Sequence, residues 1–231
     1  MTNDSCSRGK FITLEGIDGC GKSTQATLIV ETLRHMGEHV LQLREPGGSQ
    51  ISEKIRQVLL DPQNTKMSVN CELLLYEAAR TQLIDEIIEP ALSSGISVVC
   101  DRFYDSTTAY QAYAGGLDLA TCKAANMLAV GSCVPDVTVV FDLDVEEAVS
   151  RAALRCGEDP CDRMEAKGLE FQRRVADGYR HIAQDESQRV KLVDATGDIA
   201  SVALRTIAVL EQALDIEFDR DALTMAYEDL I

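Results

Sequence analysis

The sequence predicts an α/β fold, namely a doubly wound five-stranded parallel sheet flanked by helices. Five short segments are rich in apolar and β-branched residues, and they alternate with longer segments whose apolar residues recur at helical spacing. Strands that alternate with helices form parallel sheets, because each helix carries the chain back along the sheet. A chain of 231 residues can bury one sizeable core, so a single domain is expected.

Each expected element is bounded by a recognisable signal. Gly37 can adopt the left-handed conformation that ends a helix, Pro62 cannot continue a helix, and Asp118 can cap the start of one. The strands are expected at residues 11–15, 40–43, 96–100, 137–143 and 190–193. The helices are expected at residues 24–35, 51–60, 68–92, 106–113, 118–130, 145–154, 168–185 and 198–214.

A glycine-rich loop joins the first strand to the first helix. It reads Gly-Ile-Asp-Gly-Cys-Gly-Lys-Ser over residues 16–23, which is the Gly-x-x-x-x-Gly-Lys-Ser pattern of a phosphate-binding loop. Glycines allow backbone N–H groups to turn inward around a phosphate, and the helix N-terminus adds a favourable dipole. Lys22 would bridge the β- and γ-phosphates, and Ser23 would offer its hydroxyl to Mg²⁺. The loop therefore predicts a nucleoside-triphosphate site.

Other polar residues give weaker signals. Asp101 follows the third strand, where a carboxylate can hold the water shell of Mg²⁺, although a helix cap or an ion pair explains it equally well. Tyr76 and Arg80 share one helix face, but this spacing more often marks a surface stack than a binding site. Residues 151–163 are charged and are interrupted by glycine and proline, as in a solvated loop or a lid that closes over phosphates.

The composition restricts the partners of the protein. Acidic residues outnumber basic ones 38 to 22, and the net charge of −16 argues against binding to nucleic acid or to an anionic membrane. Because the predicted ligand is an anion, the basic side chains are expected to gather in one cleft. The eight cysteines are scattered, and Cys156 and Cys161 lack the spacing of a zinc site. Reduced thiols in the cytoplasm, with no membrane segment, are therefore expected.

Four motifs together resemble those of bacterial thymidylate kinases. They are Ile-Thr-Leu-Glu-Gly-Ile-Asp-Gly at the loop entry, Arg-Glu-Pro-Gly-Gly-Ser, Asp-Arg-Phe-x-x-Ser-Thr-x-Ala-Tyr-Gln, and Asp-Arg-x-Glu at residues 162–165. The resemblance covers residues 11–214. It implies a P-loop kinase fold, with one domain at residues 1–214 and a mobile lid at about residues 151–165. Residues 215–231 would form a C-terminal extension of unknown role, either exposed to solvent or folded as a short docking helix.

The resemblance also implies a reaction and its participants. The γ-phosphoryl group of ATP would pass to dTMP to give dTDP and ADP, with Mg²⁺, in a homodimer packed through helices. The ATP-binding residues would be Gly16, Ile17, Asp18, Gly19, Cys20, Gly21, Lys22, Ser23 and Thr24 of the loop, with Arg151 and Arg163 of the lid. The metal would be held by Ser23 and Asp101.

The acceptor site follows from the same resemblance. Asp18 would lie near the 3′-hydroxyl of dTMP, while Arg44 and Arg102 would bind its phosphate. Tyr76 would stack on the thymine, and Arg80 would donate to a thymine carbonyl. The remaining dTMP-binding residues would be Ser106, Thr107 and Tyr110. The catalytic residues would be Lys22, Arg102, Arg155 and Asp18.

An arginine of the lid is expected to stabilise the transition state. Gly19 occupies a position where some members of the family carry a basic residue, so another cation must neutralise the transferred charge. Arg155 is the preferred candidate because it precedes Gly157 at the expected hinge, and Arg163 and Arg151 follow. These arginines could instead pair with acidic neighbours on a solvated surface.

Cys20 is a candidate for unwanted reactivity. It lies among the backbone N–H groups of the loop and near Lys22, a setting that predicts a lowered thiol pKa. Alkylation at Cys20 is then expected to inactivate the protein, with ATP protecting it. A simpler interpretation is that Cys20 is only a small residue that fills a slot in the loop.

Three alternatives to this function differ in what they require. The nearest alternative is another nucleotide kinase or a deoxynucleoside kinase. A deoxynucleoside kinase would need a carboxylate that activates a sugar hydroxyl, and it would have no acceptor phosphate for Arg102 to bind. A P-loop regulatory NTPase that reads guanine would carry Asn-Lys-x-Asp, which this sequence lacks. An inactive binding module is the least favoured, because Lys22, Ser23, Asp101 and Arg102 are all present.

Overall fold

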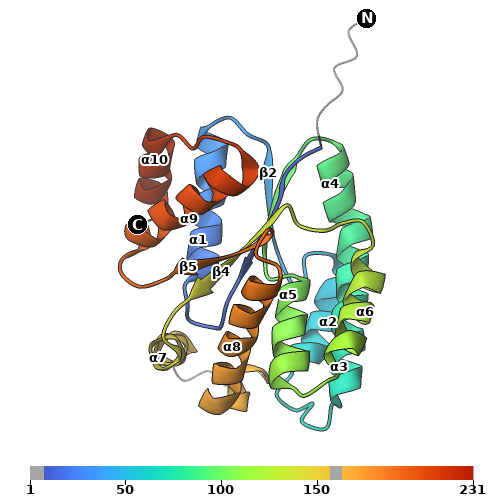
Figure 1. The fold of residues 1–231 in the computed structure, drawn as a ribbon. Coiled ribbons are helices and arrows are strands. Elements are labelled where there is room, and N and C mark those ends of the chain that lie inside the picture. The colour runs from blue at the N-terminus through green and yellow to red at the C-terminus, as the bar shows by residue number, and fades with distance from the viewer. Residues whose placement is uncertain (1–7, 157–162, 231) are drawn as a thin grey trace, which may run out of the picture.

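The structure, a computed structural model, describes residues 8–156 and 163–230 (Figure 1). Its centre is a five-stranded sheet in the order β2-β3-β1-β4-β5, in which all four neighbouring pairs are parallel. This sheet confirms the predicted fold class. The strands are β1 (Phe11–Glu15), β2 (Val40–Arg44), β3 (Ser97–Asp101), β4 (Val137–Asp142) and β5 (Val190–Asp194).

The central position of β1 places the phosphate-binding loop. All five residues of β1 are buried, because β3 and β4 flank it and helices cover both faces. Leu14 pairs with Asp101, and Arg44 pairs with the same aspartate from the other side of β3. The carboxyl ends of β1, β2 and β3 therefore meet at one edge of the sheet, where α/β proteins bind their ligands.

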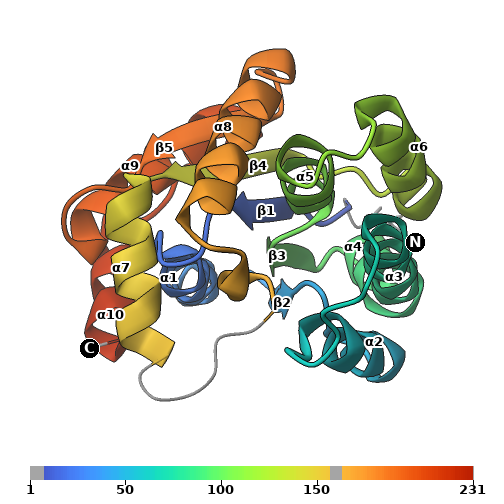
Figure 2. The ribbon, with the colours of Figure 1, turned by 90° about the horizontal axis from the view of Figure 1, so that it is seen from below.

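Helices cover the sheet on both sides (Figure 2). On one face α1 and α9 contact the strands, and on the other α4 and α8 do so. The helices are α1 (Lys22–His35), α2 (Gln50–Leu60), α3 (Val69–Leu83), α4 (Glu89–Ser93), α5 (Tyr104–Thr107), α6 (Leu119–Val130), α7 (Val145–Cys156), α8 (Leu169–Asp185), α9 (Ile199–Leu214) and α10 (Arg220–Leu230). Among the described residues, no helix is long and apolar enough to span a membrane.

Two predicted helices contain a wider turn than the sequence indicates. The helix expected over residues 68–92 is divided into α3 and α4 by a π-helical segment, Ile84–Ile88. Pro90 provides a reason, because it has no N–H for the α-helical ladder and its ring crowds the preceding turn. The helix expected over 106–113 begins earlier, as α5, and continues as the π-helical segment Thr108–Ala114. Segments of this kind often lie at functional sites.

The C-terminal extension contains a docking helix, α10. This helix packs against α1 through buried apolar side chains, including Leu223. Polar contacts support the packing, since His35 and Asp229 lie 3.0 Å apart and Arg220 pairs with Glu211 of α9. Of the two possibilities for the extension, the described residues show the docking helix over Arg220–Leu230.

We predict that the buried face of α10 contributes to the stability of the whole domain. Leu223→Ala should lower the free energy of unfolding by about 2–3 kcal/mol, because it leaves a cavity against α1. The measurement is equilibrium denaturation in urea. Met225→Ala is the matched control, since Met225 is 51% exposed on the same helix and its truncation should change little. Equal effects from the two variants would contradict the docking role.

Candidate active site

The phosphate-binding loop connects β1 to α1. Gly21 adopts a left-handed conformation with φ of 95° and directs the chain into α1, so that the first helical N–H groups face the loop. The side chain of Lys22 is buried and donates to the carbonyl of Ile17 at 3.0 Å, and it also lies 4.0 Å from Asp18. Lys22 is therefore folded over the loop, where a phosphate could take the place of this carbonyl.

Helix α7 packs directly on the loop at Gly19. A Cβ atom at Gly19 would lie 1.9 Å from the carbonyl oxygen of Ala148, far inside van der Waals contact. The φ of Gly19 is also left-handed, at 85°. No side chain fits there without movement of α7, so the loop of this chain has no room for a basic residue at that position.

Two adjoining cavities lie over the carboxyl edge of the sheet. The first, of about 300 Å³, is the phosphate cleft, lined by Asp18, Gly19, Gly21, Lys22, Ser23, Thr24, Arg44, Glu45, Arg56, Asp101 and Arg102. The second, of about 110 Å³, is the neighbouring pocket, lined by Asp18, Glu45, Pro46, Arg56, Leu60, Tyr76, Arg80, Arg102, Phe103, Ser106, Thr107, Tyr110, Gln111 and Met164. Four residues line both, which shows that the cavities are neighbours.

Ser23 and Asp101 form a pair that fits a magnesium ion. The hydroxyl of Ser23 donates to a carboxylate oxygen of Asp101 at 2.5 Å. Magnesium takes six oxygen ligands and commonly receives most of them from water and from a nucleotide. Within the described part of the chain, no group of three or more acidic, histidine or cysteine side chains could hold a metal by itself. The pair therefore suits a metal that arrives with the phosphates.

Arg102 connects the loop to the neighbouring pocket. Its backbone has a φ of 72°, which is uncommon for a residue other than glycine, and its guanidinium is largely buried. The guanidinium lies over the ring of Tyr110, with its centre 5.1 Å from the ring centroid. Its hydrogen-bond acceptors are Asp18 at 2.7 Å, Gly16 at 3.0 Å, Ser106 at 3.1 Å, and Tyr110 and Tyr179 at 3.2 Å.

Glu15 is a buried acid that the sequence analysis missed. Its carboxylate accepts hydrogen bonds from the N–H of Phe103 at 2.7 Å, from the hydroxyl of Ser106 at 2.6 Å and from Tyr179 at 2.8 Å. Burial raises the pKa of Glu15 above its usual value. The group holds the first turn of α5 and thereby orients Ser106 beside Arg102. An acidic residue at the end of a mainly apolar strand is the signal that could have revealed it.

Arg80 is fixed at the wall of the neighbouring pocket. Its side chain is 1% exposed, and it donates to Glu45 at 2.8 Å, to Glu77 at 2.8 Å and to Thr107 at 3.0 Å. Burial raises the pKa of Glu45 to about 7, even though Arg80 opposes this shift. Tyr76 lines the same pocket, so the predicted pair does share a face of α3 that looks into a site. Glu45 and Glu77 were not predicted from the sequence.

The three arginines predicted for the lid, Arg151, Arg155 and Arg163, do not share one environment in the structure. Arg151 pairs with Glu147 of the same helix at 2.5 Å, and the side chain of Arg155 lies outside the described residues, as do residues 157–162. Arg163, which the sequence predicts at ATP, lies beside the neighbouring pocket in this structure and pairs with Glu72 of α3. A guanidinium and a buried carboxylate form a strong charge-assisted pair.

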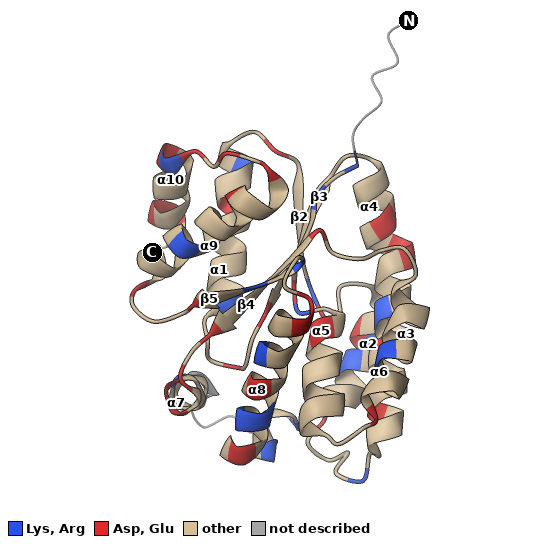
Figure 3. Cartoon of the chain, in the orientation of Figure 1, with Lys and Arg blue, Asp and Glu red and all other residues tan. Residues whose placement is uncertain are grey.

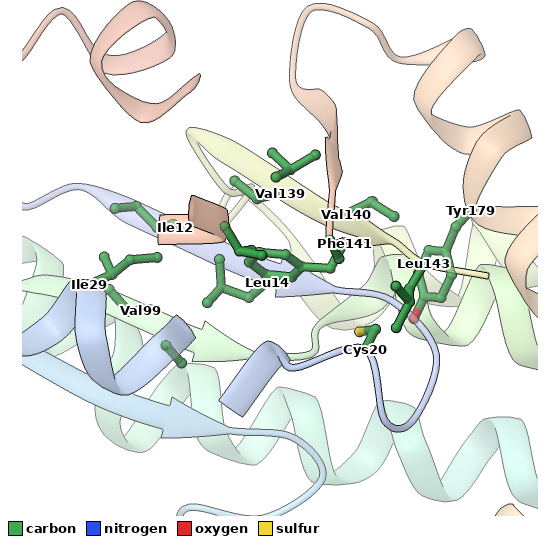
Figure 4. Close-up of a cluster of buried hydrophobic side chains, with 14 of the residues drawn as sticks. Ile12, Leu14, Cys20, Ile29, Val99, Val139, Val140, Phe141, Leu143 and Tyr179 are labelled. Carbon is green, nitrogen blue, oxygen red and sulfur yellow. The ribbon is translucent and has the colours of Figure 1, made fainter. Parts of the chain in front are cut away.

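The expected acidity of Cys20 is wrong. Cys20 is 2% exposed and belongs to the buried apolar cluster that also contains Leu143 and Tyr179 (Figure 4). Burial raises the pKa of Cys20, and this outweighs the nearby charge of Lys22. The interpretation of Cys20 as a small residue filling a slot is the one that agrees with the structure.

The basic side chains are only partly concentrated as expected. Five of them line the two cavities, namely Lys22, Arg44, Arg56, Arg80 and Arg102. Arg44 is also paired with Glu53 at 3.0 Å at the exposed rim. Other basic residues lie on the outside of the molecule, for example along α8, where acidic residues alternate with them (Figure 3).

The fold and the loop define a P-loop kinase, an ATP-dependent phosphotransferase. The profile of the thymidylate kinase family matches residues 14–205, and the chain belongs to that family. It is 45% identical to a thymidylate kinase of Desulfosudis oleivorans over 89% of this chain and 98% of the relative. It is 44% identical to a thymidylate kinase of Caldanaerobacter subterraneus subsp. tengcongensis, over 90% and 97% respectively. A crystal structure of thymidylate kinase from Ehrlichia chaffeensis aligns with a TM-score of 0.72 at 32% identity, covering 88% of this chain and 99% of that one.

We predict that Cys20 resists alkylation in the folded protein. Its burial and raised pKa leave little accessible thiolate at neutral pH, whereas the exposed Cys71 should react readily. Iodoacetamide labelling followed by peptide mass spectrometry measures both sites in one sample, and activity should be retained. Labelling in denaturant is the control, in which Cys20 should react. Rapid labelling of Cys20 in the native protein would show that the loop opens.

Proposed function

We propose that the protein transfers the γ-phosphoryl group of ATP to dTMP and releases ADP and dTDP. The observation that carries this proposal is the position of Arg102, which lines both the phosphate cleft and the neighbouring pocket. An arginine in that place can hold an acceptor phosphate opposite the γ-phosphate of ATP. Membership of the thymidylate kinase family supports dTMP as the acceptor.

The donor half of the proposed site is the loop of residues 16–24. The phosphates of ATP would accept hydrogen bonds from the loop N–H groups, and Lys22 would exchange the carbonyl of Ile17 for phosphate oxygens. Ser23 and Asp101 would hold Mg²⁺, which when bound neutralises charge on the phosphates. The phosphate cleft has the volume and the basic lining for this role.

The acceptor half is the neighbouring pocket. Tyr76 would stack on the thymine, and Arg80 would donate to a thymine carbonyl from a guanidinium that two carboxylates hold in place. Asp18 would lie near the 3′-hydroxyl of the sugar. The other residues proposed to contact dTMP are Arg44, Arg102, Ser106, Thr107 and Tyr110.

The chemistry requires alignment and charge neutralisation more than proton transfer. The phosphate of dTMP is itself the nucleophile, so no residue has to act as a general base. Arg102 would position that phosphate in line with the γ-phosphate, and Lys22 would neutralise the charge that develops on transfer. Arg155 stays our prediction for the further transition-state donor, and Arg151 would have to leave Glu147 to replace it.

A panel of acceptors tests the proposed function. With ATP and Mg²⁺, ADP release should be fast with dTMP, slower with dUMP and absent with dGMP. Losing the thymine methyl should cost about 1–3 kcal/mol, whereas a purine is larger than the pyrimidine that Tyr76 and Arg80 would hold. Thymidine should not be phosphorylated, and its turnover would favour a deoxynucleoside kinase. Equal rates with dTMP and dGMP would reject the proposal.

Two variants serve as controls for the panel, because they separate the two halves of the site. Arg102→Ala should weaken dTMP binding about tenfold or more while leaving ATP binding nearly intact, since a charge-assisted contact to one phosphate is lost. Lys22→Ala should have the opposite pattern. Calorimetric titration of each variant with each nucleotide measures both effects, and an exchange of the two patterns would mean that the sites are reversed.

We also propose that the protein is a cytoplasmic homodimer that binds neither nucleic acid nor membranes. Helices α2, α3 and α6 lie side by side (Figure 2) and present exposed apolar side chains, of which Leu128 is 88% exposed. Such side chains commonly mark interaction surfaces. The others on these helices are Ile51, Val58, Leu74 and Met127.

We predict that Leu128→Glu dissociates the proposed dimer. A carboxylate placed in an apolar interface would lose its hydration without gaining a partner, which disfavours association. Sedimentation velocity at micromolar concentration should give a dimer for the unaltered protein and a monomer for the variant. Leu204→Glu, at an exposed apolar position on α9 where Leu204 is 49% exposed, is the control and should remain dimeric. A monomer in all three samples would contradict the proposal.

A further inference from the structure

A buried carboxylate, Glu72, joins three parts of the chain at the side of the neighbouring pocket. Glu72 lies in the first turn of α3, and its side chain is 3% exposed. It accepts a hydrogen bond from Gln111 at 2.7 Å and pairs with Arg163 and with Lys167, the latter at 3.3 Å. Gln111 belongs to the π-helical segment after α5, and the two cations precede α8.

The same contacts position residues that line the pocket. Arg163 also donates from its Nε atom to the carbonyl of Leu59 at 2.8 Å, and its backbone N–H donates to the carbonyl of Leu60. Leu60, Gln111 and Met164 all line the neighbouring pocket. Met164 directly follows Arg163, so the position of its side chain depends on how that arginine is held.

The Glu72 cluster consists of Glu72, Gln111, Arg163 and Lys167, and buried charges hold it together. Burial opposes ionisation of Glu72, but the hydrogen bond from Gln111 and the charges of Lys167 and Arg163 outweigh it, and the pKa of Glu72 is lowered. The carboxylate therefore stays charged at neutral pH. Removing one partner of a buried pair leaves the other without compensation, so each member of the cluster depends on the rest.

We propose that Glu72 is a positioning residue for the acceptor: it sets the position of Gln111 directly, and that of Met164 through Arg163, in the pocket wall. This inference rests on the proposed assignment of that pocket to dTMP. It gives Arg163 a role in acceptor affinity in place of the ATP contact expected from the sequence. Glu72 touches neither substrate, and it acts only through the residues that it holds.

Steady-state kinetics of Glu72→Gln test this proposal. The substitution keeps the shape of the side chain and removes its charge. We expect KM for dTMP to rise about tenfold, a typical result of breaking one member of a coupled cluster, while kcat and KM for ATP stay within about twofold. Arg163→Gln should give the same pattern. The double variant should be hardly worse than either single one, because both remove the same interaction.

The control and the contrary outcomes distinguish positioning from general support of the fold. Glu211→Gln removes the ion pair with Arg220 far from the pocket and should leave all three constants unchanged. A rise in KM for ATP, or a fall in kcat with KM for dTMP unchanged, would place Arg163 at the donor and overturn the proposal. Additive effects of the two substitutions would also overturn it.

Thermal unfolding shows whether each variant is folded. If Glu72→Gln does not fold, the kinetic constants of Arg163→Gln decide whether the proposal holds. Turnover of dTMP by the unaltered protein in the same assay tests separately whether dTMP is the acceptor.

Discussion

The guanidinium of Arg102 links the phosphate cleft to the neighbouring pocket, and the arrangement of the site depends on it. This buried cation is held by Gly16 and Asp18 of the loop on one side, and by Ser106, Tyr110 and Tyr179 on the other. Reactions between two phosphates are fast only when the reacting groups are aligned to within a fraction of an ångström. A single group that contacts the phosphate loop, α5 and α8 together provides such a fixed reference, and its cost is an uncommon backbone conformation at Arg102.

Buried acids complete this arrangement by orienting the basic groups. Glu15 holds the hydroxyls of Ser106 and Tyr179, which in turn meet Arg102, while Glu45 and Glu77 hold Arg80. A protein with a net charge of −16 thereby creates a cleft whose walls are rich in arginine. The outer surface carries most of the acidic excess, and the interior acids act over one or two hydrogen bonds. Local pairing, not total charge, makes the site suitable for an anion.

Several features could be predicted because they depend on neighbours in the sequence. The phosphate loop, the five strands and the cap at Asp118 rest on spacings of a few residues, and each is present where expected. The pair Tyr76 and Arg80 also faces one pocket, as helical spacing requires. The predicted boundaries were less accurate where two local signals conflict. Near Pro90 the apolar spacing predicts one continuous helix, whereas the structure has a π-helical segment just before the proline.

By itself, then, the sequence determined the fold class, the phosphate loop and the family resemblance, since these are carried by short patterns. Only the tertiary structure decided which charges meet. Arg163 and Glu72 are 91 residues apart, and Glu15 meets Tyr179 across 164 residues, so no local pattern could pair them. It also decided the state of Cys20, because burial in the core opposes the acidity that its loop neighbours suggest. Burial and long-range contact are properties of the folded chain, and a residue's nearest neighbours in sequence do not specify them.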